Sequence, residues 1–180
     1  QFLYIIPGFI AIATFPTLSK LASTDKNQFN NALNKVIRAV FVFSLPIVTV
    51  GIVLSKKIIL LAFGYEYITA YMSMSILLLL VLINFPAAVL ENAILAYNQQ
   101  RQSLKYSLSA LVLNIVLNYL LIPKYGISGA ATATLISTTL GLFLIFKSFI
   151  NRNGFKIKLN LISIVFSTTI VGLITITLNF

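Results

Sequence analysis

The sequence contains no cysteine and no histidine, and only three of its 180 residues are acidic. Without cysteine the chain can form neither a native disulfide bond nor a thiolate metal site. With no histidine and with its acids far apart, it lacks the clusters that bind metal ions or carry acid–base catalysis. It also lacks a glycine-rich phosphate loop and a nucleophile elbow. These absences argue against an enzyme and predict neither a metal site nor a cofactor.

Charge is scarce as well. Charged residues make up 9% of the chain and hydrophobic residues 59%, whereas soluble domains carry about 25% charged residues. The mean hydropathy is +0.99. A soluble fold of this size would need a far larger polar exterior than these residues supply. The chain is therefore predicted to lie in a lipid bilayer.

Continuous apolar runs predict helices rather than strands. Only α-helices and closed barrels satisfy all backbone groups within lipid. A barrel strand alternates apolar and polar residues, whereas SILLLLVLI at 75–83 is unbroken. A spanning helix needs about 20 mostly apolar residues. The sequence thus predicts an all-α integral membrane fold with about six transmembrane helices, over about 1–18, 36–55, 72–97, 103–122, 127–147 and 159–180.

The sequence opens on Gln1 and runs directly into an apolar segment. No basic start region and no small-residue cleavage site is evident, so a signal peptide is a poor explanation. We expect the sequence to be a piece of a longer membrane protein that begins inside a helix.

The basic residues predict the orientation. Cytoplasmic loops of membrane proteins collect Lys and Arg, and alternate connections here hold ten basic residues against three. The richer set is Lys20, Lys26, Lys35, Arg38, Arg101, Lys105, Lys147, Arg152, Lys156 and Lys158. That side is predicted to face the cytoplasm. Because these cations lie at helix ends, where they also attract anionic lipids, the net charge of +10 does not indicate a nucleic-acid partner.

A proline and a glycine interrupt the apolar pattern between the fourth and fifth predicted helices. Pro123 and Gly126 predict a turn of about four residues, so the two helices should be antiparallel neighbours. After the turn, small residues recur at every fourth position, namely Gly129, Ala133, Ser137 and Gly141. Small residues at this spacing let membrane helices approach closely. We predict that these four residues pack helix against helix.

Asparagines inside the predicted spans are costly in lipid and should face a partner or a cavity. Asn84 lies near the middle of the third predicted helix, and Asn114 and Asn118 share a stripe of the fourth. Two interpretations remain open. Either an Asn–Asn hydrogen bond joins the two helices, or the amides line a polar cavity.

Glu91 is the only acidic residue within a predicted span, on the same stripe as Asn84. It could pair with Arg38 or Arg101 near the inner surface, or cap a neighbouring helix end. It could instead contact substrate or a coupling ion, either a proton or sodium.

Mid-span prolines and short connections favour a transporter. Pro46 and Pro86 each remove a backbone donor, so each is predicted to kink its helix. Kinked helices at mid-depth recur in secondary transporters. The outward connections at about 56–71 and 123–126 are too small for an extracellular active site, which argues against a membrane polymerase.

Three ordered stretches resemble a known family. They are TFPTLSKLASTDKNQF (14–29), FSLPIVTVGIVLSKKIILLAFGYEY (43–67) and ILAYNQQRQSLKYSLSALVLNIVLNYLLIPKYGISGAATATLIS (94–137). The sequence resembles the polysaccharide flippases of the multidrug/oligosaccharidyl-lipid/polysaccharide exporter superfamily. The resemblance covers roughly residues 10–150 and depends on the order of the motifs more than on any one of them.

The resemblance implies two six-helix lobes around a cavity that opens alternately to each side of the cell membrane. Residues 1–158 would form most of the C-terminal lobe and 159–180 an additional helix, with the N-terminal lobe missing. The implied substrate is an isoprenoid-pyrophosphate-linked oligosaccharide, carried from the cytoplasmic to the outer leaflet for polysaccharide biosynthesis.

The resemblance also implies cavity cations that meet the pyrophosphate. Here the candidates are Arg38, Arg101 and Lys105, which lie at inner helix ends rather than at mid-depth. The asparagines would face the sugars, with Glu91 as a coupling or gating acid. A cation-coupled multidrug exporter of the same fold and a non-transporting membrane scaffold are the alternative functions.

Overall fold

The computed structural model describes residues 5–155, so the predicted helix at 159–180 lies outside the described residues. The described part is all-helical. Its elements are α1 (Ile5–Thr24), α2 (Lys26–Phe63), the 3₁₀ helix η2 (Tyr65–Ala70), α3 (Tyr71–Ala96) and α4 (Gln100–Asn153). Three helical stretches are long and apolar enough to cross a membrane, namely 26–63, 65–96 and 100–153.

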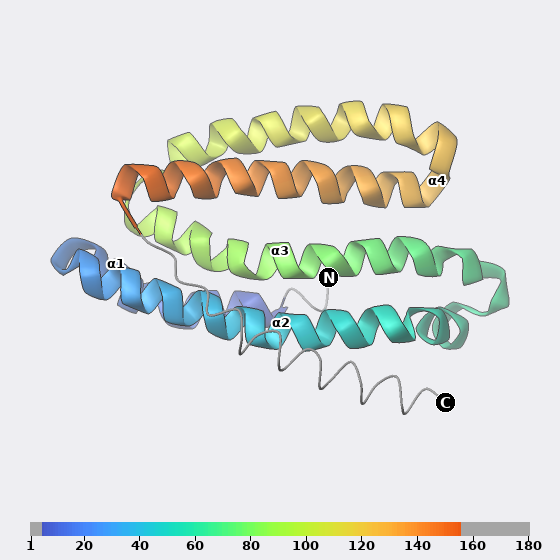
Figure 1. Cartoon of the computed structure of the whole chain (residues 1–180), viewed down its shortest axis with the longest axis horizontal. Coiled ribbons are helices and arrows are strands. Elements are labelled where there is room, and N and C mark those ends of the chain that lie inside the picture. Colours follow the sequence, from blue (N-terminus) through green and yellow to red (C-terminus); the bar gives the residue numbers. More distant parts are fainter. Residues whose placement is uncertain (1–4, 156–180) are drawn as a thin grey trace.

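The helices lie alongside one another in an elongated bundle (Figure 1). Helix α3 is central, because it packs against α1, α2 and α4. The α1–α2 connection, the α3–α4 connection and the end of α4 share one end of the bundle, and η2 lies at the other (Figure 1). The connections richest in basic residues therefore gather at one end, as a bundle with a single cytoplasmic face requires.

Helix α4 folds back on itself at Gly126. This residue has φ 55° and ψ −132°, while the residues on either side remain helical. A positive φ with extended ψ is accessible to glycine and strained for other residues. The first arm (100–125) and the second arm (127–153) run antiparallel, as the sequence predicts (Figure 1). The turn is tighter than expected, because Pro123 remains inside the helix.

Helix α2 contains the predicted span of 36–55 and extends beyond it at both ends. It begins at Lys26 because the Asp25 carboxylate accepts hydrogen bonds from the backbone N–H groups of Asn27 (2.8 Å) and Gln28 (3.0 Å). This is an N-cap. Buried side chains in the added turns then pack the extension against the bundle. As a result Arg38 lies twelve residues inside α2 rather than in its first turn.

The cap at Asp25 should depend on pH. Backbone N–H groups, that of Gln28 foremost, hold the pKa of the Asp25 carboxyl below its usual range. Because the folded-state pKa is the lower one, the contribution is complete above the unfolded-state pKa and is lost as pH falls through the folded-state pKa. We expect Asp25→Ala to speed amide hydrogen exchange over residues 26–30, and Asp25→Asn, which keeps an acceptor, to speed it less. Equal exchange in the two variants would contradict the cap.

Four aromatic side chains join three helix ends at the basic end of the bundle. This aromatic cluster consists of Phe29 in α2, Tyr97 after α3, Phe149 in α4 and Phe155 after α4. Phe29 meets Tyr97 edge-on at 4.9 Å and stacks on Phe155 at 5.2 Å between ring centroids. Phe29, Phe149 and Phe155 are buried. The cluster fixes the ends of α2, α3 and α4 relative to one another, since aromatic pairs at these distances attract beyond their burial.

Candidate functional site

A cavity with four polar side chains among its walls, which we call the polar cavity, lies between α3 and the two arms of α4. Its volume is about 380 Å³, and its walls are Asn84, Ala87, Ala88 and Glu91 of α3 with Ser107, Ala110, Thr138, Gly141, Leu142 and Ile145 of α4. Two of the predicted site residues, Asn84 and Glu91, therefore meet in one cavity. Ser107 and Thr138, one from each arm of α4, add their hydroxyls to the lining of the same cavity.

Glu91 lines two hollows. Besides the polar cavity, it borders a hollow of about 410 Å³ with Ser103, Leu104 and Ser107 among its walls. Within residues 5–155, no hydrogen bond or ion pair engages its carboxylate, so the suggested pairing with Arg38 or Arg101 is not formed there. The carboxylate is thus placed to meet a cation or a polar ligand in the cavity.

Asn114 and Asn118 occupy a different environment. Neither lines the polar cavity. The amide of Asn114 donates to Ser137 Oγ across the two arms at 2.9 Å, and the amide of Asn118 donates to Asn114 Oδ1 at 2.9 Å. The interhelical hydrogen bond of Asn114 therefore joins the two arms of α4 and not α3 to α4, and its partner is a serine rather than an asparagine. This geometry favours a packing role for Asn114 and Asn118.

The four small residues of the second arm are all buried. An added Cβ at Gly129 would lie 2.4 Å from the carbonyl oxygen of Leu121, and one at Gly141 would lie 2.6 Å from Ala110 Cβ. Ser137, between them, receives the Asn114 hydrogen bond. The two arms thus approach too closely at these glycines for a larger residue, which is the geometry expected of a packing ridge.

The two mid-span prolines lie inside uninterrupted helices, Pro46 in α2 and Pro86 in α3. Pro86 also lines an apolar groove of about 370 Å³ between α2, α3 and the second arm of α4. The groove is lined by Ile37, Phe41, Leu82, Ile83, Pro86, Ala87, Leu90, Thr139, Leu142, Phe143 and Phe146. It shares Ala87 and Leu142 with the polar cavity, so the two spaces are neighbours. The sequence gives no signal for this groove, because its residues resemble the rest of the apolar spans.

Arg101 and Lys105 line a separate space at the basic end of the bundle, which we call the cationic hollow. It measures about 880 Å³ and is also bordered by Arg152, Asn98, Gln99, Gln102 and Tyr106. The predicted cations are therefore not brought together, since Arg38 is not among its walls. Arg152, which the sequence analysis counted only toward orientation, joins the other two here.

Residues 5–155 contain no group of three or more His, Cys, Asp and Glu side chains that could hold a metal ion. The polar cavity offers one carboxylate, one amide and two hydroxyls. Such a set suits hydrogen bonding to hydroxyl groups or weak binding of a monovalent cation, and it offers no nucleophile paired with a base.

Comparison with known proteins gives a consistent result. The family model for the lipid II flippase MurJ matches residues 3–179. The chain is 32% identical over 141 residues to the "Probable flippase AglR" of Haloferax volcanii, a match that covers 76% of this chain and 29% of the relative. It is 30% identical over 142 residues to the "Putative O-antigen transporter" of Shigella flexneri, covering 78% and 34%. The chain thus spans about a third of the length of these curated relatives or less.

Proposed function

Because the chain belongs to the MurJ flippase family, a family of multi-pass membrane transporters and not of enzymes, we propose that the whole protein flips a lipid-linked oligosaccharide. The substrate would be an isoprenoid-pyrophosphate-linked glycan, moved from the cytoplasmic to the outer leaflet for cell-surface polysaccharide biosynthesis. The names of the relatives, a flippase and an O-antigen transporter, support this class of substrate.

The observation that carries the proposal is the polar cavity beside the apolar groove. An amphiphile with a sugar head and a lipid tail needs a polar and an apolar surface in contact, and here they share Ala87 and Leu142. The amide of Asn84 and the hydroxyls of Ser107 and Thr138 would bind sugar hydroxyls. Glu91 would bind the coupling proton or sodium ion, or gate the cavity.

In the proposed architecture the described bundle is one part of a larger transporter, to which a sixth helix and a second lobe belong. Helices α1, α2 and α3 with the two arms of α4 would be five of six transmembrane helices of a C-terminal lobe, and 159–180 the sixth. A second lobe would complete the cavity. Transport would proceed by alternating access, with Pro46 and Pro86 bending α2 and α3 as the lobes rock.

A deletion of the full-length gene tests the proposal. Host cells would be treated, or left untreated, with an enzyme that digests oligosaccharide only from outside. Their lipid-linked oligosaccharides would then be extracted and quantified by mass spectrometry. We expect completed oligosaccharide to build up in a form protected from outside digestion. An unchanged pool in a host without a second flippase would overturn the proposal and favour drug or ion export.

Two asparagines at similar positions should behave differently. We expect Asn84→Leu to reduce glycan transport in cells at normal protein levels, because it removes an amide from the polar cavity. Asn114→Leu should instead lower stability by about 1 kcal/mol, because it breaks the bond to Ser137 and removes the side-chain acceptor of Asn118. Transport by the complemented deletion strain and thermal unfolding of the purified protein separate the two effects. Full transport with Asn84→Leu would assign that amide to packing.

A further inference from the structure

The cationic hollow brings three positive charges together without a carboxylate. Arg101 and Lys105 come from the start of the first arm of α4, and Arg152 comes from the end of the second arm. None of the three acidic residues of the sequence is among its walls. Within residues 5–155, neither the Arg101 guanidinium nor the Lys105 ammonium group takes part in a hydrogen bond or ion pair. The described chain therefore does not neutralise the positive charge of the hollow, which is available to an anionic ligand.

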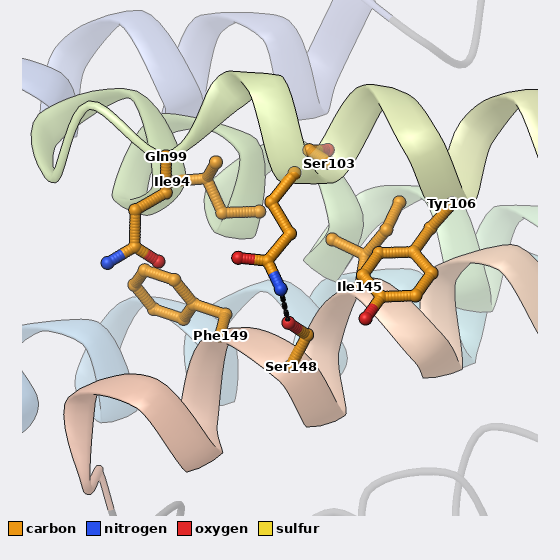
Figure 2. A pocket seen from close by; sticks show the side chains of 8 residues that line it. Ile94, Gln99, Ser103, Tyr106, Ile145, Ser148 and Phe149 are labelled. Carbon is orange, nitrogen blue, oxygen red and sulfur yellow. Dashed lines mark hydrogen bonds between the residues drawn. The ribbon is translucent and has the colours of Figure 1, made fainter.

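Neutral amides hold Arg152 in place. Arg152 Nη1 donates to Gln102 Oε1. Gln102 Nε2 in turn donates to Ser148 Oγ at 2.7 Å, the bond dashed in Figure 2. Closer to the ends of the two arms, the amides of Gln99 and Asn153 exchange hydrogen bonds of 3.2 and 3.3 Å. These contacts fix the guanidinium between the two arms without neutralising it. An oriented guanidinium beside further cations is suited to the oxygens of a phosphate group.

An apolar surface begins one turn from these cations. Leu104, Leu108, Leu111, Val112 and Ile115, all exposed, form an apolar stripe along the first arm. Residues 104, 108, 111 and 115 recur at the three- and four-residue spacing that places side chains on one face of a helix. Exposed apolar side chains continue at the same spacing to Tyr119 and Ile122. From 104 to 122 this face is roughly 27 Å long, close to a hydrocarbon core of about 30 Å, so it can lie against acyl chains from the cations inward.

We propose that the cationic hollow binds the phosphate headgroup of an anionic phospholipid of the cytoplasmic leaflet, whose acyl chains lie along the apolar stripe. The positive charge of the hollow and the exposed apolar side chains that begin one turn away select this occupant, which is anionic at one end and apolar at the other. Tyr106, a wall of the hollow, has the amphipathic ring that membrane interfaces favour. The site is distinct from the polar cavity, and the proposal does not depend on which substrate is transported.

Lipid retention by the full-length protein tests the site. The protein would be taken from nanodiscs of equal parts phosphatidylglycerol and phosphatidylcholine, washed in detergent, and its retained lipid counted by native mass spectrometry. The hollow variant is Arg101→Gln/Lys105→Gln/Arg152→Gln. The control variant Lys20→Gln/Lys35→Gln/Lys147→Gln removes the same charge from residues outside the hollow. We expect retained phosphatidylglycerol to fall about tenfold or more in the hollow variant and to change little in the control.

Three results would overturn the proposal. Equal losses in the two variants would indicate general surface attraction, and equal retention of phosphatidylcholine would indicate no headgroup selectivity. Displacement of phosphatidylglycerol from the unmodified protein by isoprenyl pyrophosphate would assign the hollow to the transported lipid instead. Thermal unfolding of both variants checks that they are folded. The variant Arg101→Lys/Arg152→Lys, which keeps the charge, should retain phosphatidylglycerol if charge rather than local packing holds the lipid.

Discussion

Replacing Gly129 with alanine is expected to lower the free energy of unfolding by about 3 kcal/mol, the upper part of the usual range for overpacking. The added Cβ would lie 2.4 Å from the carbonyl oxygen of Leu121 and 2.7 Å from its carbonyl carbon. A backbone group cannot rotate away as a side chain can. The two arms of α4 would therefore have to move apart near the turn. Thermal or denaturant unfolding of the purified protein measures the loss.

Two other glycines provide matched controls. A Cβ at Gly51 would meet Leu78 Cδ1 at 2.8 Å, but a leucine methyl can move, so Gly51→Ala should cost less than Gly129→Ala. A Cβ at Gly8 meets nothing within 4 Å. There alanine should be neutral or stabilising by up to about 1 kcal/mol, because it favours the helix. If Gly129→Ala and Gly51→Ala lowered the free energy of unfolding equally, the two arms of α4 would separate as easily as a leucine methyl moves.

Truncation of Phe29 should have an effect of similar or greater size. This side chain is 0% exposed and contacts both Tyr97 and Phe155 in the aromatic cluster. Phe29→Ala is expected to cost about 3–5 kcal/mol, as is usual for a buried phenylalanine. It should also loosen the first turns of α2, because the Phe29 ring contacts both Tyr97 and Phe155, whereas Lys26 of the same turns lies over the Phe155 ring alone. Equilibrium unfolding gives the size, and amide hydrogen exchange over 26–35 gives the location.

Phe43 is the matched control for Phe29, since it belongs to the same helix but is 59% exposed. Phe43→Ala should leave the free energy of unfolding nearly unchanged in detergent. A loss for Phe29→Ala no larger than that for Phe43→Ala would show that the aromatic cluster does not hold the helix ends together.

These two predictions concern the parts of the fold that position the polar cavity. The close approach at Gly129 and Gly141 brings the two arms together, and Gly141 is itself a wall of the cavity. The aromatic cluster holds the opposite ends of α2, α3 and α4. Loss of either should therefore reduce transport through loss of structure, whereas Asn84→Leu should reduce transport by removing an amide from the polar cavity.

The sequence by itself determined the class of the protein. Few charges and long apolar runs require a bilayer, and the need to satisfy backbone groups in lipid requires helices. The predicted span 72–97 differs by one residue at each end from α3, Tyr71–Ala96. The ordered motifs also predicted the flippase family that the comparisons then showed. Composition and motif order suffice here because the bilayer leaves few alternatives.

Only the tertiary structure decided which residues share a site. In an apolar helix nearly every face is hydrophobic, so periodicity does not tell which side meets a neighbour and which meets lipid. The sequence therefore could not separate Asn84, a wall of the polar cavity, from Asn114, which bonds Ser137. Nor did the sequence indicate that Arg101 and Arg152 line the same hollow, because it is the reversal of α4 at Gly126 that brings them together. Packing between helices sets these pairings, because in lipid the fit of side chains replaces the hydrophobic drive that marks the inner face of a soluble helix.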